Sequence, residues 1–563
     1  MPAHISKLLG RLEAAKRLFG HKDIAGLEKT LKLVAHRRMS DPEQVIRFHE
    51  SLLFFRAYPP TAGVLRQVER SLSTFRERVE ALRKSGVDLS PLAHPEVSGI
   101  AGTSVTDTFG YYVVCWLQRR YPSQIALDWE WFEDENRLAA TWPRFLPLLE
   151  EDAYVEANVP YQRWLQTAKG QSRDLAWLLS RFESLPLNDE EKAELFDSQK
   201  LYVRWTPEDR ATRTGMKRAT HRVFYHRRPL IIRRQVSLPD EMRMARFSLL
   251  RLSKRRGEWI LNLARETSTV RYRELYGFTH GDPERVVRAS VGRGVDLFVI
   301  GLLPERRLPL RAYHAALIFK NGVPVAYFEG LSLFERMESG FNLYYSFREG
   351  ETAWIYAKTL ALFHRLLGVD TFTIDPYQIG YENEEGIESG AFWFYRKLGF
   401  SPARQELLKI VKKEEERLAV RSGYRTPARV LRKLAEGSLI LAPTNEKRGD
   451  WDHFQVRNVG LAIQRRMAAE FKGDAKLFRT AASTLVSRVT GLKPKSLTKA
   501  ELNALDKLGP ALMLIRELEL WSAREKRDLA QVIRAKAAGD ETAYLRLLQR
   551  HERLREGILK LGS

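Results

Sequence analysis

Apolar residues in the first two hundred positions recur at the spacing of a helix face. From Ile5 to Leu12 they lie three or four apart, so they share one side of a helix. Ser40-Asp-Pro-Glu43 has the pattern of a capping box with proline in the first turn, and Tyr58-Pro-Pro60 is expected to stop the helix that it opens. Asn188-Asp-Glu-Glu191 opens another helix. The pattern predicts a mostly helical N-terminal region over residues 1–205.

Further along the chain the pattern changes to continuous apolar runs typical of buried strands. The run Val295–Ile300 is the first clear one. Ala315–Phe319 and Val323–Phe328 flank Asn321-Gly322, which predicts a hairpin because both turn residues tolerate positive φ. Phe341–Phe347 is predicted as a third strand of this group. Weaker strand predictions fall on two earlier segments, Leu230–Ile232 and Trp259–Leu263.

A helix and a further strand follow this hairpin region. The helix is predicted over 351–367, ended by Gly368, and the strand over Thr371–Ile374. Strand, helix and strand in this order imply a right-handed crossover and a parallel pair. Gly437–Leu441 is a candidate returning strand, and the later chain is helical, with a capping box at Thr498-x-x-Glu501.

These elements predict an α/β central domain with a mixed sheet, flanked by mostly α-helical N- and C-terminal regions. The expected domains are 1–205, 206–442 with its core at 295–402, and 443–563. Residues 445–452 are expected to form a linker.

Composition and charge add three expectations to this outline. The values of 44% hydrophobic and 29% charged residues are those of a globular protein. No apolar run reaches the roughly 18 residues that a membrane helix needs, and a signal peptide is not apparent, so a cytoplasmic location is expected. Cys115 is the only cysteine, which excludes an internal disulfide, and its apolar setting indicates a buried, inert thiol.

The net charge of +23 is concentrated in one tract of the chain. Residues 211–260 hold fourteen Lys or Arg against three acids, a net +11. Aromatic residues interleave with the arginines, as at Phe224 and Tyr225, and this combination suits phosphates and stacked bases. The basic tract 213–256 is therefore a candidate site for nucleic acid or tRNA. Two other accounts are open: a solvated surface, and packing against the acidic segment Asp128–Glu135.

The segment Ser389-Gly-Ala-Phe-Trp-Phe-Tyr-Arg-Lys-Leu-Gly-Phe400 predicts a short aromatic helix that ends at Gly399 and runs into a strand. Ala391 and Tyr395 lie four apart and share a helix face. This stretch resembles the last helix of the GCN5-related N-acetyltransferase (GNAT) family, where Ala-x-x-x-Tyr runs into Leu-Gly-Phe. The resemblance covers about residues 295–402.

The resemblance extends to a loop that in this family holds the pyrophosphate of coenzyme A. The family pattern is Arg/Gln-x-x-Gly-x-Gly/Ala at a helix start, where backbone amides and the helix dipole face the phosphates. Here the segment is Arg348-Glu-Gly350-Glu351-Thr352-Ala353. It implies cofactor binding by Arg348, Gly350, Glu351, Thr352 and Ala353. Glu351 departs from the family by replacing the central glycine, because a carboxylate repels a pyrophosphate and a β-carbon hinders close backbone approach.

The resemblance also implies roles for two candidate catalytic residues. Tyr395 corresponds to the family's tyrosine that protonates the leaving thiolate. Asp375 follows a predicted parallel strand, at the end where open α/β sheets bind ligands, and is a candidate general base. Glu329 and His314 are weaker candidates for the base. The family's usual Asn before the alanine is replaced by Glu388. No zinc or other metal motif is present in the sequence.

Three functions follow as alternatives. The first is acyl transfer from acetyl-CoA or another acyl-CoA, as co-substrate, to an amine. The second is transfer from aminoacyl-tRNA on the same fold, with the basic tract holding tRNA. The third is a non-catalytic GNAT-like scaffold or nucleic-acid-binding protein. The acyl group, the acceptor and the oligomeric state cannot be read from the sequence.

Overall fold

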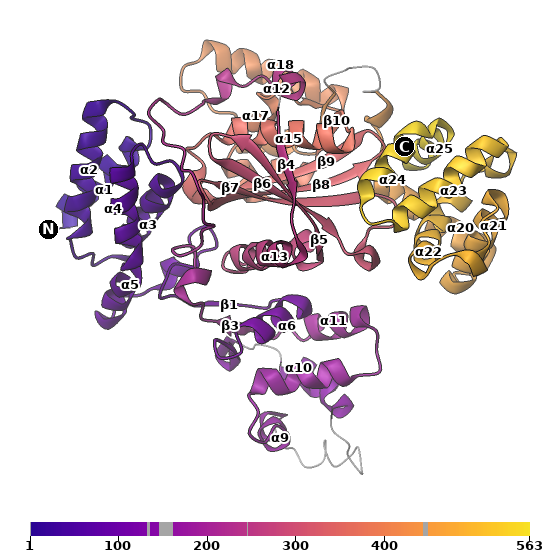
Figure 1. Cartoon of the computed structure of the whole chain (residues 1–563), viewed down its shortest axis with the longest axis horizontal. Coiled ribbons are helices and arrows are strands. Elements are labelled where there is room, and N and C mark those ends of the chain that lie inside the picture. Colours follow the sequence, from indigo (N-terminus) through magenta and orange to yellow (C-terminus); the bar gives the residue numbers. More distant parts are fainter. Residues whose placement is uncertain (1, 132–134, 146–160, 245, 443–448) are drawn as a thin grey trace.

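The computed structural model describes residues 2–131, 135–145, 161–244, 246–442 and 449–563. Within them the protein is mixed α/β: a nine-stranded mixed sheet occupies the centre, and helices flank it at both ends of the chain (Figure 1). Residues 445–448 of the predicted linker lie outside the described residues, whereas Gly449–Trp451 forms a 3₁₀ turn in which Trp451 is buried.

The N-terminal helices form a bundle against one side of the central sheet (Figure 1). The helix α3 is buried along almost its whole length and forms the middle of the bundle. Its N-cap is Asp41, one residue later than predicted, and the Asp41 side chain accepts a hydrogen bond from the Glu43 amide (3.0 Å). The five helices are α1 (Pro2–Ala15), α2 (His21–Ala35), α3 (Pro42–Ala57), α4 (Ala62–Ser73) and α5 (Phe75–Lys84).

A small lobe follows this bundle and contains a sheet that the sequence pattern did not predict. Its strand order is β1-β3-β2, with both neighbours antiparallel to β3. Each strand has only three residues, too few for a period of two to stand out from the helical background. The elements are β1 (Val105–Asp107), α6 (Tyr111–Arg120), β2 (Ile125–Leu127), α7 (Glu135–Thr141), α9 (Tyr161–Ala168), α10 (Asp174–Ser184), α11 (Asp189–Ser198) and β3 (Val203–Trp205).

The central sheet has the strand order β11-β12-β10-β9-β8-β7-β6-β5-β4. Successive strands from β4 to β9 are antiparallel, β10 is parallel to β9, and β12 is antiparallel to β10. The strands are β4 (Ser248–Arg251), β5 (Gly281–Gly292), β6 (Val295–Leu302), β7 (Ala312–Lys320), β8 (Val323–Leu333), β9 (Arg336–Leu343), β10 (Thr371–Ile374), β11 (Ser401–Pro402) and β12 (Leu439–Leu441).

Several predictions in this sheet are confirmed. The hairpin β7–β8 turns at Asn321 (φ 49°) and Gly322 (φ 80°). The helix α15 (Thr352–Leu367) joins β9 to its parallel neighbour β10, as predicted. The candidate returning strand is β12, which pairs between β10 and β11.

Three strand predictions are wrong in position or kind. The strand predicted at 341–347 is β9, which ends at Leu343, and Tyr345–Phe347 forms a 3₁₀ turn. Trp259–Leu263 lies in helix α13 (Lys254–Thr269), where a five-residue apolar run cannot distinguish the two periods. Residues 230–232 form no strand and instead lie in an extended arm that crosses from the bundle to helix α12 (Leu238–Met244).

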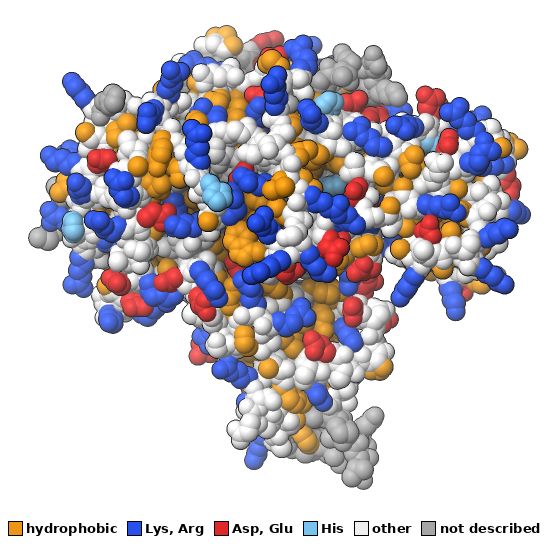
Figure 2. All heavy atoms as spheres, viewed as in Figure 1, with side chains coloured by type: hydrophobic (Ala, Val, Ile, Leu, Met, Phe, Trp, Pro, Cys, Tyr) orange, Lys and Arg blue, Asp and Glu red, His pale blue; other side chains and the backbone are white. Residues whose placement is uncertain are grey.

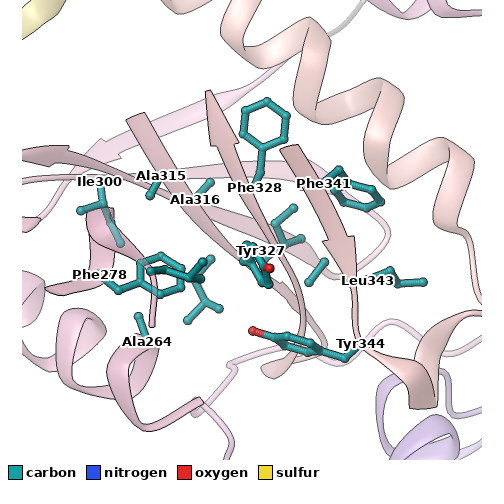
Figure 3. Packing of buried hydrophobic residues seen from close by; sticks show 14 of the residues in the cluster. Ala264, Phe278, Ile300, Ala315, Ala316, Tyr327, Phe328, Phe341, Leu343 and Tyr344 are labelled. Atoms are coloured by element: carbon teal, nitrogen blue, oxygen red, sulfur yellow. The ribbon is translucent and has the colours of Figure 1, made fainter. Parts of the chain in front are cut away.

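Helices cover both faces of the sheet. Helix α13 lies on one face and α15 on the other (Figure 1), and the short α14 (Tyr276–Thr279) contacts α13 and strands β5 to β7. Side chains alternate accordingly along β8: Tyr327 packs against Phe278 of α14 (6.4 Å between ring centroids), whereas Phe328 stacks on Phe363 of α15 (4.9 Å). Figure 3 shows this division of the core. The helices that follow β10 are α16 (Glu384–Glu388), α17 (Ala391–Arg396), α18 (Gln405–Val420) and α19 (Ala428–Leu434).

The C-terminal helices pack against the end of the sheet opposite the N-terminal bundle (Figure 1). Thr498 and Glu501 form the predicted capping box. Arg555 ties these helices to the sheet through a buried ion pair with Glu335, which also accepts from Trp451 Nε1 (2.8 Å). None of the described helices is both long and apolar enough to span a bilayer. The helices are α20 (Val456–Phe471), α21 (Ala475–Thr490), α22 (Lys499–Met513), α23 (Ala523–Ala537), α24 (Glu541–Arg550) and α25 (Glu552–Gly562).

Candidate active site

The parallel strands β9 and β10 pair over only three residues and then separate. Arg336, Met337 and Glu338 pair with residues 371–373, after which β9 continues to Leu343 with β8 as its partner. Strand β10 ends at Ile374, where the chain turns into a 3₁₀ helix. A cavity of about 710 Å³ opens at this separation.

Residues from five parts of the chain line this cavity, one of them Pro95. Strands β8 and β9 contribute to the lining, as do the loop between α13 and α14 and the segment from the 3₁₀ helix Pro376–Ile379 to α17. The segment before α15 lies at its rim. The polar and charged lining residues are Arg271, Tyr272, Arg273, Tyr327, Glu329, Asn342, Arg348, Thr352, Tyr377, Gln378, Asn383, Glu385, Ser389 and Tyr395.

Tyr395 lies in the cavity wall, on the face of α17 that the sequence predicted. Ala391, four residues earlier, lines the same cavity. The Tyr395 ring packs edge-on against Tyr356 (5.7 Å) and Phe400 (5.8 Å), which fixes its orientation. Its hydroxyl has no hydrogen-bond partner among the described residues. Burial raises the pKa of Tyr395 well above its ordinary value, so the phenol stays protonated at neutral pH and can donate a proton.

Glu329 and Glu385 are the two carboxylates that line the same cavity as Tyr395. Glu329 lies on β8, and its side chain accepts a hydrogen bond from the Tyr313 hydroxyl. Burial raises the pKa of Glu329 above its ordinary value, which makes it a better proton acceptor at neutral pH than a solvated carboxylate. The environment of Glu329 therefore favours proton acceptance.

The other two candidates for the base lie elsewhere. The Asp375 carboxylate accepts from the Tyr377 amide (2.9 Å) and caps the 3₁₀ turn after β10, and Asp375 is not among the residues that line the cavity. His314 is buried in the core and borders a separate small cavity of about 110 Å³. The structure thus brings Tyr395 and Glu329 to one cavity but not Asp375 or His314.

The predicted pyrophosphate loop is divided between the cavity and the N-terminal bundle. Arg348 and Thr352 line the cavity. Gly350 instead packs against Tyr58, so closely that a β-carbon there would lie 2.5 Å from the Tyr58 hydroxyl. The Glu351 amide donates to the same hydroxyl (3.4 Å), and Ala353 is buried. The bundle therefore covers the middle of the loop.

The Glu351 side chain is the centre of a buried ion cluster. It is fully buried and pairs with Lys320 (3.2 Å), which is also fully buried, and with Arg293. It also accepts from the Ile231 amide (3.1 Å). The neighbouring cations lower the pKa of Glu351 despite its burial, whereas burial lowers the pKa of Lys320 to about 8. Glu351 thus has a structural role, and it does not line the cavity.

The basic tract 213–256 is partly neutralised within the protein. Arg213 pairs with Glu50 (2.8 Å) in the core, Lys217 with Glu69 (3.0 Å), and Arg218 with Asp296. None of the ion pairs of the tract involves the described part of the acidic segment Asp128–Glu135, whose residues 132–134 lie outside the described residues. Most of the remaining arginines are exposed, and Figure 2 shows basic side chains spread over one face of the molecule among acidic ones. The exposed arginines are Arg222, Arg227, Arg228, Arg234, Arg243, Arg246, Arg251, Arg255 and Arg256, whereas Arg233 is partly buried.

Sequence reasoning missed the loop Arg271-Tyr272-Arg273, which contributes two cations to the cavity. Two arginines around an aromatic residue directly after a helix can indicate an anion site, but the longer basic tract upstream carries the same kind of signal more strongly. Among the described residues no group of three or more potential ligands could hold a metal ion. Cys115 is buried, as expected, and burial raises its pKa to about 11.

Comparisons with models of known families, with curated proteins and with solved structures found no match for this chain.

Proposed function

We propose that this protein is an N-acyltransferase that transfers an acyl group to an amine in the cavity between β9 and β10. The observation that carries the proposal is the position of Tyr395 and Glu329 in one cavity, at the point where two parallel strands separate. The GNAT resemblance at residues 389–400 supports it. So does the strand order around α15, because β9, α15, β10 and α17 follow the order expected for that family.

The proposed chemistry divides the proton transfers between two residues. Glu329 takes a proton from the attacking amine, directly or through one water molecule. The amine nitrogen forms a bond to the acyl carbonyl carbon, and the bond from that carbon to the leaving group breaks. Tyr395 gives its proton to the leaving atom, which is the sulfur of an acyl-CoA thioester. The raised pKa of Glu329 suits its role because it makes the carboxylate a stronger base, and Tyr395 is protonated at neutral pH and so carries the proton that its role requires.

Acyl-CoA is the proposed donor, with Arg348 and Thr352 at the cavity rim as the residues that would meet its phosphates. A second donor, aminoacyl-tRNA, is favoured by one specific observation: Tyr58 covers Gly350 and the Glu351 amide. Such a donor has its phosphates in a polynucleotide and needs no pyrophosphate loop. In that case an ester oxygen is the leaving atom, and Tyr395 protonates it in the same way.

The experiment supplies purified protein with radiolabelled acetyl-CoA or aminoacyl-tRNA and a library of amines, and measures label transferred to amine. Tyr395→Phe is expected to slow transfer about 10²-fold or more, within the range of general acid catalysis. Tyr225→Phe, a half-exposed tyrosine outside the cavity, is the matched control and is expected to keep full activity. Transfer at equal rates by both variants would show that Tyr395 is only a core aromatic residue.

The same experiment addresses the non-catalytic alternative. A scaffold would transfer no label from either donor and would show no coenzyme A binding by calorimetry at millimolar concentration.

A further inference from the structure

Arg271 is a buried cation without an anionic partner. Its residue exposure is 6%, and among the described residues no carboxylate lies within ion-pair distance of its guanidinium. Nη1 donates to the Thr267 carbonyl (2.6 Å), and Nε has no acceptor among the described residues. A buried charge that lacks a counter-ion is costly, because the lost hydration is not replaced. Such a group is stabilised when an anion arrives.

Arg271 lines the cavity of the candidate active site. It lies in the loop after α13 that forms one wall of the cavity. Its guanidinium stacks on the Tyr344 ring, 3.8 Å from the centroid, and this stack restricts the side chain to one orientation. Burial lowers the pKa of Arg271 to about 9, and the neighbouring Arg213 and Arg273 add to this effect while the Glu50 carboxylate opposes it. An arginine held this way is preorganised for a ligand. A neutral residue of similar size could supply the same packing.

A second arginine of the same loop is adjacent to the first. Arg273 donates to the Tyr327 hydroxyl (3.2 Å), and Tyr327 lies 6.2 Å from Tyr344 between ring centroids. Its other terminal nitrogen lies 3.5 Å from the Glu385 carboxylate, a long contact that Glu385 shares with Arg348 (2.8 Å). Figure 3 shows Tyr327 and Tyr344 together beneath the strands. The lining therefore carries Arg271, Arg273 and Arg348 against Glu329 and Glu385, a positive balance.

The anion site lies a short distance from the proposed base. Tyr327 and Glu329 are two residues apart on β8, so they point to the same face of the sheet with Cα atoms about 7 Å apart. Both arginines and Glu329 line one cavity, so a ligand whose anionic group meets the arginines can present an amine to Glu329. Small amino acids and aminoalkyl phosphates carry both groups.

We infer that the cavity recognises an acceptor that carries both an amine and an anionic group, with Arg271 and Arg273 binding the anion while Glu329 receives the amine. This inference rests on the proposed function, because only acyl transfer makes the amine the group that reacts at Glu329. The binding itself does not depend on catalysis. The anion is a carboxylate or a phosphate, since a guanidinium pair accepts either.

The test measures binding to the full-length protein by calorimetry without any acyl donor. The ligands are free amino acids, the same amino acids as α-amides, and phosphoethanolamine. The acids or the phosphate are expected to bind about tenfold or more tightly than the amides, the ratio for one charge-assisted hydrogen bond. Arg271→Gln is expected to remove that preference. Arg255→Gln, an exposed arginine on α13, is the control and is expected to keep it.

Several results would overturn the inference. They are equal binding of acids and amides by the wild-type protein, no binding of any of these ligands at millimolar concentration, and a preference retained by Arg271→Gln. The comparison of acids with amides needs no variant, so the test stands even if Arg271→Gln fails to fold. A preference for acids in a protein that transfers no acyl group would refute the proposed function alone, whereas acyl transfer to amines that lack an anion would refute this inference alone.

Discussion

Replacing Glu351 with alanine is expected to destabilise the central sheet strongly, because it leaves Lys320 as an unpaired charge in the core. Lys320 is fully buried at the end of β7 and has Glu351 as its ion-pair partner at 3.2 Å. Arg293 is partly exposed and can turn toward water, but Lys320 cannot. Removing one member of a buried pair costs about 3–5 kcal/mol. Glu351→Ala should therefore lose stability of that order.

A double substitution tests the reasoning behind this magnitude. Lys320→Met with Glu351→Leu replaces the pair by apolar side chains of similar volume, a change that is often neutral or stabilising. The double variant should therefore be more stable than Glu351→Ala. The assay is hydrogen exchange of peptides from β7 and β8, which reports local opening without requiring two-state unfolding of so large a chain. Asp240→Asn, which breaks an exposed pair with Arg243, is the control and should exchange like the wild type.

Two results would refute the interpretation of Glu351 as a structural residue. One is wild-type protection in Glu351→Ala. The other is a double variant that is no more stable than Glu351→Ala. That result would mean that the loss of stability comes from the altered start of α15 and not from the unpaired charge of Lys320.

Three further predictions follow from the structure. His226 is buried with no partner for either ring nitrogen among the described residues, and burial lowers its pKa to about 3. Because the unfolded chain binds the proton first, stability should fall by about 1.4 kcal/mol per pH unit as the pH drops from about 6.5 toward 3, and His226→Leu should flatten that loss in thermal melts. Glu329→Gln should slow acyl transfer about 10²-fold or more and remove the acidic limb of its pH–rate profile, whereas Asp375→Asn should leave both unchanged. If RNA or DNA binds the basic tract, each neutralised phosphate contributes about −0.7 to −0.9 to the slope of log affinity against log salt concentration. Charge reversal at Arg227, Arg228 and Arg234 should flatten this slope in filter binding while the variant melts normally. An unchanged slope would exclude the tract as the binding site.

Much of the central sheet was predictable because its signals are local. Asn321-Gly322 specifies its own turn, and Gly368 ends α15 with a left-handed residue (φ 74°), so the hairpin and the crossover could be inferred from a few adjacent positions. The boundary of β9 was not predictable in this way. Residues 344–347 are as apolar as the strand before them, and their 3₁₀ turn is set by packing against the N-terminal bundle, including a Ser346 hydrogen bond to Glu50.

In the candidate site, too, features set by adjacent residues could be predicted and features set by distant ones could not. That Tyr395 and Ala391 share one face of a short helix could be predicted, because their spacing of four residues is visible in the sequence. The roles of Glu351 and Asp375 were not, because each depends on a neighbour that only the fold supplies: Lys320 and Arg293 for the first, and the amide of Tyr377 for the second. Arg271 was missed for the same reason, since its burial against Tyr344 joins segments far apart in the chain.

The contacts between the N-terminal bundle and the sheet bear on how this protein could have arisen by exchange of gene segments. The hairpin tip at Asn321 donates to the Ala57 carbonyl (2.8 Å), Glu50 binds Arg213 in the core, and Tyr58 covers Gly350. A sheet segment transferred into another gene without this bundle would expose those buried polar groups and the start of α15. The central sheet is therefore not expected to fold as an independent domain without the N-terminal bundle. The bundle and the sheet are expected to be inherited together.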